Sequence, residues 1–212
     1  MLAALAAIDA GGEPADRFPL ARLAALEVPR QRNLLRYLMD RCGLPLPGAG
    51  RLGELVRQLA SAPAASIHVA WPGGEARTYR DWLFLQTPLA ADRDAADPGS
   101  LTPDRPWQGP AGTLRLEATD GAGIPARMAQ RGLRVGFRHG GERFLPAGHR
   151  QHKLLKQWLQ EHGVVPWMRD SVPLLFAEDR IVAIADLDLA ADCEAVSDTR
   201  YRPVWEASRR FR

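Results

Sequence analysis

The stretch RHGGERFLPAGHRQHKLLKQWLQEHGVVPWMRDSVPLLF, residues 138–176, carries the most informative pattern in this chain. A double-glycine turn leads into a basic segment with helical periodicity, and a Pro-Trp-x-Arg-Asp motif then leads into a short apolar run. Helical spacing followed by a short apolar run predicts that helix and strand alternate closely here. We therefore expect a mixed α+β domain around this stretch.

The segment from about His149 to His162 is predicted to form an amphipathic helix. The apolar face, which we expect in the core, consists of Leu154, Leu155, Trp158, Leu159 and His162. The opposite face consists of Lys153, Lys156, Gln157 and Gln160. Lys153 and Lys156 are the only two lysines among the 28 Lys and Arg residues of the chain. An ammonium group and a guanidinium group are not equivalent in binding, so the pair suggests a site that favours lysine.

Positive charge is concentrated in the same region. The whole chain has a net charge of +3 and a sequence pI of about 9.2, which by itself names no partner. Residues 131–170 hold eight Arg or Lys residues, three acidic residues and four of the five histidines. A local field of this kind attracts polyanions such as nucleic acid.

The double glycine at 140–141 could expose backbone N–H groups next to the start of the predicted helix. With Arg138, Arg143 and Arg150 nearby, this arrangement predicts a phosphate site. It is not a Walker-type loop, because no Gly-Lys-Ser/Thr follows. The alternative is an ordinary solvated charged face.

Two enzyme alternatives were weighed for the same stretch. His149 and His152 could begin a metal site, but no HExxH motif or His/Cys cluster accompanies them. Ser171 could act as a nucleophile, but no G-x-S-x-G motif supports it. In the Pro-Trp-x-Arg-Asp motif we expect Trp167 to fill the core. Arg169 either pairs with Asp170 or faces a ligand.

The rest of the chain predicts two domains. Residues 1–88 read as a small helical domain that ends in a β-hairpin or small sheet, because helical leucine spacing gives way to alternation at Ile67, Val69 and Trp71. Residues 89–111 are rich in Pro, Gly, Asp and Ala and are expected to be a linker. Residues 112–212 read as a mixed α+β domain of short strands with one main amphipathic helix.

The two cysteines, Cys42 and Cys193, match no zinc or redox spacing, so we expect reduced thiols in a cytoplasmic protein. The first residues have no basic n-region, and their apolar run is too short to span a membrane.

The quoted stretch resembles the C-terminal region of bacterial tRNA(Ile)-lysidine synthase. The matching positions are Arg138, Gly140-Gly141-Glu142-Arg143, Leu154-Leu155-Lys156, Gly163-Val164-Val165-Pro166-Trp167, Arg169-Asp170 and Pro173-Leu174-Leu175. The first half is similar, more weakly, to the family's substrate-recognition domain. The positions that carry this second likeness are Arg30-Gln31-Arg32-Asn33-Leu34-Leu35-Arg36, Trp71, Arg77, Tyr79, Arg80 and Leu83.

The resemblance implies an enzyme that uses ATP and Mg to join lysine to the wobble cytidine of a tRNA(Ile) with a CAU anticodon. That chemistry belongs to an N-terminal domain with an S-G-G-x-D-S loop, and no such loop occurs in this sequence. We therefore expect no cofactor, metal or catalytic residue in this chain, and no activity from it alone. A second departure is the stretch Ala185-Asp186-Leu187-Asp188, where the family more often has a glycine turn.

The resemblance and the basic segment together predict a tRNA-binding role. The residues expected to contact tRNA are Arg138, Arg143, Arg150, Lys153, Lys156, Arg169, Arg32 and Arg36. The expected partner is tRNA(Ile) with a CAU anticodon, with no membrane association, and homodimer formation is left open. The alternative is a protein-interaction or structural module with an incidental basic surface.

Overall fold

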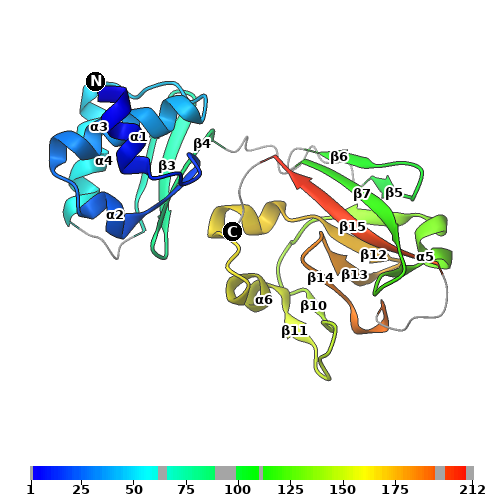
Figure 1. Ribbon diagram of the computed structural model, residues 1–212. Coiled ribbons are helices and arrows are strands. Elements are labelled where there is room, and N and C mark those ends of the chain that lie inside the picture. The colour runs from blue at the N-terminus through cyan, green and yellow to red at the C-terminus, as the bar shows by residue number, and fades with distance from the viewer. Residues whose placement is uncertain (1, 62–65, 89–98, 110–111, 194–198, 209–212) are drawn as a thin grey trace. The chain divides into compact units, whose positions relative to one another are not determined.

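In the computed structural model, the chain divides into two units, Met1–Ala90 and Ala91–Arg212 (Figure 1). The structure describes residues 2–61, 66–88, 99–109, 112–193 and 199–208. Helices and antiparallel sheets occur in both units, which confirms the predicted α+β class.

Four helices lie in the first unit, where the leucine spacing predicted helical structure. They are α1 (Leu2–Ala10), α2 (Leu20–Ala24), α3 (Val28–Arg41) and α4 (Ala49–Ser61). Leu34, Leu35 and Leu38 of α3 are fully buried. The chain leaves α3 through Gly43, whose φ of 66° is in the left-handed region that glycine adopts without strain. The α3 face that carries these leucines therefore packs into the core of this unit.

A four-stranded antiparallel sheet completes the first unit. Its strands are β1 (Arg17–Pro19), β2 (His68–Trp71), β3 (Gly74–Tyr79) and β4 (Trp82–Gln86), in the order β1-β4-β3-β2. The predicted hairpin is β2 and β3. The predicted return strand is in fact two strands, because Arg80 adopts a φ of 53° and reverses the chain before Trp82. β1 was not predicted, since three residues are too few to show alternation.

The second unit contains two larger antiparallel sheets and one small one. The five-stranded sheet has the order β14 (Asp188–Leu189), β13 (Arg180–Ile184), β12 (Leu174–Ala177), β9 (Leu133–Gly136), β5 (Ser100–Leu101). The four-stranded sheet has the order β6 (Trp107–Gly109), β7 (Gly112–Thr119), β15 (Arg200–Ala207), β8 (Ile124–Pro125). The small sheet pairs β10 (Arg143–Phe144) with β11 (Lys153–Leu154). The helical segments are α5 (Ala126–Arg131), α6 (Leu155–Glu161) and the 3-10 helices η1 (Pro166–Ser171) and η2 (Ala191–Cys193).

The predicted linker, residues 89–111, is wrong over its second half. Residues 89–98 and 110–111 lie outside the described residues, but β5 and β6 pair with β9 and β7. Leu101 is fully buried and Trp107 is 5 % exposed. These two isolated apolar side chains anchor a segment whose Pro and Gly content predicted a loop.

The predicted helix from His149 to His162 is also corrected. Only Leu155–Glu161 is α-helical, and the residues just before it form β11, which pairs with β10. Leu154 has an extended backbone (φ −68°, ψ 125°), so it is the last residue of β11. It is also the N-cap residue of α6, which begins at Leu155. The side chains before α6 happen to follow helical spacing, and β11 has only two residues, too few to show the two-residue alternation of a strand.

The Pro-Trp-x-Arg-Asp motif forms η1, which begins at Pro166, where a proline costs no hydrogen bond. Met168 is fully buried and Trp167 is half-buried, so Met168, not Trp167, fills the core. A 3-10 helix repeats every three residues, and this period directs Val165 and Met168 inward together.

Candidate functional site

The double-glycine turn forms as predicted, but two of its backbone amides, those of His139 and Gly140, are already occupied. Gly140 and Gly141 have φ values of 114° and 86°. The backbone N–H groups of His139 and Gly140 donate to Oε1 of Glu142, at 2.8 Å for Gly140. The carbonyl oxygen of Glu142 accepts the N–H of Leu155 at 2.9 Å. Glu142 therefore connects the turn to the first residue of α6, and a phosphate would have to displace a carboxylate from these amides.

The electrostatics of Glu142 agree with this geometry. Burial raises the pKa of its carboxyl, but hydrogen bonds from the N–H groups of His139, Glu142 and Gly140, with the charge of Arg138, outweigh burial and hold the pKa below its ordinary value. The turn thus contains a stable internal anion.

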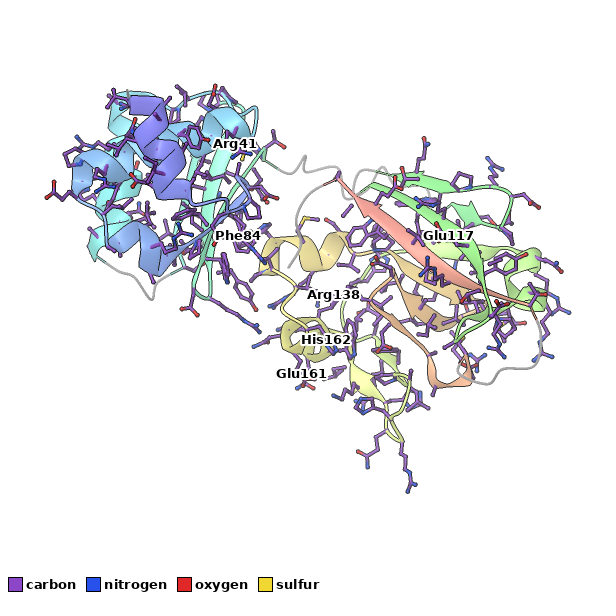
Figure 2. All side chains as sticks on the ribbon, in the orientation of Figure 1. Arg41, Phe84, Glu117, Arg138, Glu161 and His162 are labelled. Atoms are coloured by element: carbon purple, nitrogen blue, oxygen red, sulfur yellow. The ribbon has the colours of Figure 1, made fainter. Side chains whose placement is uncertain are left out.

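Two of the predicted tRNA-binding arginines hold η1 in place. Arg138 forms an ion pair with Asp170, a residue 32 positions away, with Nε 3.1 Å from Oδ1 (Figure 2). Arg169 donates from Nε to the carbonyl oxygen of Val164 at 2.9 Å. Asp170 therefore has Arg138 as an ion-pair partner. The sequence alone suggested only Arg169 as a partner for Asp170. Both arginines are half-buried, and both contribute to the architecture of this segment.

The two lysines lie in different environments. Lys153 is on β11, and its Nζ lies 3.0 Å from Oε2 of Glu161, at the end of α6. Lys156 is exposed on α6 and has no ion pair among the described residues. The predicted common face is wrong, because Lys153 precedes the helix. Lys156 is the lysine that presents an uncompensated charge.

The remaining cations of this segment are more open to solvent. Arg143, on β10, is exposed and donates from Nη2 to the carbonyl oxygen of His152 at 3.2 Å. Arg150 is exposed in the connection between β10 and β11. Lys156 on α6 is the third exposed cation of the β10–β11–α6 region. We call the three residues Arg143, Arg150 and Lys156 the basic segment.

Trp158 packs α6 against β10. It is fully buried, and its ring meets Phe144 of β10 edge-on with 5.7 Å between ring centroids. It also stacks on His162 with 3.7 Å between ring centroids. Nδ1 of His162 lies 2.8 Å from the carbonyl oxygen of Trp158. Aromatic packing of this kind fixes the backbone that carries Arg143 and Lys156.

The first unit contributes Arg32 and Arg36, one turn apart on α3. Both are exposed, while Leu34, Leu35 and Leu38 cover the buried side of the same helix. The two guanidinium groups have no ion pair within the part of the chain that is described. The amphipathic pattern therefore places them on the surface, as predicted.

The enzyme alternatives depend on His149, His152 and Ser171. Among the described residues, no group of three His, Cys, Asp or Glu side chains could hold a metal ion. Ser171 is half-buried at the end of η1. Cys42 and Cys193 are free thiols, and burial raises the pKa of each to about 11, so both are protonated at neutral pH and are weak nucleophiles.

Sequence reasoning missed a surface network and a cavity in the second unit. Arg115 pairs with Glu117 and with Glu206, and Arg202 pairs with Glu117 across β7 and β15 (Figure 2). Alternation along β7 was the available signal, since Arg115 and Glu117 lie two residues apart on one face. The cavity has a volume of about 470 Å³ and lies between the 186–189 turn and β15. No sequence pattern could have revealed it, because the two segments meet only in the fold.

None of the helices in the described part of the chain combines the length and the apolarity that a membrane crossing requires.

Comparison with known proteins gives matches over both units. The family model for the TilS substrate binding domain matches residues 18–84, and the model for the TilS substrate C-terminal domain matches residues 133–205. Relatives named tRNA(Ile)-lysidine synthase include those of Nitrosomonas europaea (35 % identical over 204 residues, 91 % of this chain and 43 % of the relative) and Alkalilimnicola ehrlichii (36 % over 185 residues, 84 % and 40 %). The relative from Ralstonia nicotianae is 34 % identical over 190 residues, 82 % of this chain and 40 % of its own length. The chain thus spans about two fifths of the length of these relatives.

Proposed function

The chain belongs to the tRNA(Ile)-lysidine synthase family, and we propose that its two units bind and position the tRNA substrate of that ligase. The observation that carries the proposal is the match of two substrate-domain models to the two units, with exposed cations in both matched regions. The contacts we assign to RNA are the basic segment, consisting of Arg143, Arg150 and Lys156, and the pair Arg32 and Arg36 on α3.

The complete reaction that we propose for the family enzyme joins lysine to the wobble cytidine of a tRNA(Ile) with a CAU anticodon, using ATP and Mg, in the cytoplasm. Neither the S-G-G-x-D-S loop nor another phosphate loop that would bind ATP occurs in this sequence. We therefore propose that the ATP and Mg sites belong to a part of the enzyme outside the matched region. The purified chain should show no ATP-dependent incorporation of lysine into tRNA.

Phosphate backbones suit the exposed cations of the basic segment. Each phosphate contact that releases a counterion adds a slope of about −0.7 to −0.9 to log K against log salt. The three other predicted contacts, Arg138, Lys153 and Arg169, already have partners within the chain: Asp170, Glu161 and the carbonyl oxygen of Val164. These three residues shape the segment, and their direct share of RNA binding is proposed to be smaller.

The test is a titration of the chain with tRNA(Ile) at several salt concentrations. The wild-type chain should bind with a clearly negative salt slope. Arg150→Glu combined with Lys156→Glu should weaken binding at least tenfold. The control, Arg105→Glu with Arg127→Glu, makes the same charge change at exposed positions of the same unit and should weaken binding much less.

Three outcomes would contradict the proposal. The first is no binding at low salt, and the second is a salt slope near zero. The third is equal competition by an unrelated polyanion such as heparin, which would favour a structural or protein-interaction module with incidental charge. Sizing of the free chain by light scattering would show whether two copies associate.

A further inference from the structure

The cavity between the two larger sheets of the second unit has the composition of a binding site. Its volume is about 470 Å³, within the usual range for small-molecule sites. Its polar lining residues carry charges of both signs, Asp186 and Asp188 on one side and Arg202 on the other. Its apolar lining includes Leu187, Pro203 and Val204. A ligand here meets apolar side chains and separate groups that accept and donate hydrogen bonds.

The backbone around the cavity is constrained to this shape. Ala185, the residue just before the lining turn, is fully buried and has a φ of 42°, a left-handed conformation that is unfavourable for alanine. On the other side, β8 pairs only with Arg200 and Tyr201 of β15. The next residues of β15, from Arg202 to Val204, line the cavity.

Two hydrogen bonds fix the orientation of the Asp188 carboxylate. Its Oδ1 accepts the N–H of Leu189 at 2.8 Å, and the side chain of Trp158 also donates to it. A carboxylate has about four lone-pair sites, so two bonds leave further acceptors available. Arg202 uses one Nη2–H for Glu117 at 2.8 Å, and a guanidinium has five donors. Both groups therefore keep hydrogen-bonding capacity for a ligand.

The charges also narrow the class of ligand. Carboxylates repel phosphate, so this cavity does not fit an RNA backbone. An unpaired base is different, because RNA-binding proteins read the edges of splayed bases with hydrogen bonds. Guanine is the base with two adjacent donors, N1–H and the N2 amino group, next to the acceptors O6 and N7. An acceptor-only carboxylate and a donor-only guanidinium that line the same cavity can complement that edge.

We propose that this cavity binds the guanine of an unpaired nucleotide, with Asp188 accepting from N1–H and the N2 amino group and Arg202 donating to O6 or N7. The inference rests on the proposed RNA-binding function. It adds base recognition to a unit whose other proposed contacts are with phosphates, so the same unit would both position the RNA and read one base.

The experiment measures binding of nucleoside monophosphates to the whole chain by calorimetry or NMR shift mapping at pH 8. Guanosine monophosphate should bind at least tenfold more tightly than adenosine monophosphate. Inosine monophosphate, which lacks the N2 amino group, should bind several-fold less tightly than guanosine monophosphate. Shifts should be centred on residues 186–189 and 202–204.

Asp188→Asn should reduce the affinity for guanosine monophosphate roughly tenfold, the size expected for loss of a charge-assisted hydrogen bond. Asp179→Asn, at an exposed position outside the cavity, is the matched control. Asp186→Asn serves as a second cavity variant, since Asp186 is exposed and its replacement should leave the fold intact, as circular dichroism can check. Equal affinity for the guanine and adenine nucleotides, or unchanged affinity in both cavity variants, would overturn the inference.

Failure here can be told apart from failure of the proposed function. A duplex RNA without unpaired guanine should bind the wild-type chain and Asp188→Asn equally, with the same salt slope. Salt-dependent RNA binding without a preference for guanine would eliminate the base site alone. Absence of RNA binding by the wild-type chain would instead contradict the proposed function, whatever the nucleotide measurement shows.

Discussion

At the residue scale, two lysines that look equivalent in sequence differ in their ion pairing. Lys153 shares its charge with Glu161 at 3.0 Å, whereas Lys156 is exposed on α6 without an ion pair among the described residues. An exposed pair of this kind stabilises a protein little, but it lowers the charge that a phosphate would meet.

The difference can be measured with charge-removing substitutions. Lys156→Gln should weaken tRNA binding by several-fold and make the salt slope about 0.7 to 0.9 less negative, because one phosphate contact is lost. Lys153→Gln is the matched control and should change both quantities less. Salt-dependent titration of the two variants gives the comparison, and a larger effect at Lys153 would show that the Glu161 pair opens on binding.

A second residue-scale prediction concerns Gly140. An added Cβ would meet nothing within 4 Å, so space does not forbid a side chain, but the φ of 114° does. Gly140→Ala should lower the free energy of unfolding by about 1–3 kcal/mol, the usual cost of a residue in a disfavoured backbone region. Gly121→Ala, where the backbone is not left-handed and the nearest contact is 3.6 Å, should cost much less. Urea denaturation of the second unit would measure both, and equal losses would refute the conformational argument.

At the element scale, a buried carboxylate connects three strands of the first unit. Glu75 on β3 is 2 % exposed and accepts hydrogen bonds from Arg77 at 3.0 Å and from Gln86 of β4 at 2.6 Å, with His68 of β2 at 2.9 Å. Burial raises the pKa of Glu75, but these hydrogen bonds and the charge of Arg77 outweigh burial and hold the pKa below its ordinary value.

The sign of this shift predicts acid sensitivity. A carboxyl whose pKa is lower in the folded chain stabilises the fold above the unfolded pKa of about 4.5 and loses that contribution as the pH falls through the folded value. The melting temperature of the first unit should therefore fall as the pH drops from about 5 towards 3. Glu75→Gln should be less stable than wild type at pH 7 and should show a weaker fall. A pH dependence identical to that of the wild type would assign the acid sensitivity to other carboxyls.

At the scale of the whole molecule, each unit has its own sheets. The first unit has a single core cluster, built from α1 to α4 and the sheet β1-β4-β3-β2, and the second unit has its own buried residues in three further sheets. Units that each bury a core generally fold independently.

We therefore expect residues 1–90 and residues 91–212 to fold when expressed separately. Each should show a cooperative urea transition and dispersed amide signals in NMR spectra. The second unit should retain the proposed guanine site and part of the salt-dependent RNA binding, because the cavity and the basic segment lie within it. Loss of the cooperative transition in either piece would show that its core depends on the other.

The sequence by itself determined the α+β class, the leucine faces of α3 and α4, the β2–β3 hairpin and the surface position of Arg32, Arg36 and Lys156. All of these follow from local periodicity and from turn residues such as Gly43 and Gly73, whose signals lie within one element. The resemblance carried by the 138–176 stretch pointed to the family that the domain models then matched.

Only the tertiary structure decided which cations have partners and where the cavity lies. Arg138 meets Asp170 across 32 residues of chain, Glu142 accepts from amides of its own turn, and Asp188 and Arg202 line one cavity from different sheets. Side-chain pairing and concavity depend on segments that are distant in sequence, and periodicity carries no information about such distances. The basic character of the 138–176 stretch was therefore readable from the sequence, while the assignment of each charge to a role required the fold.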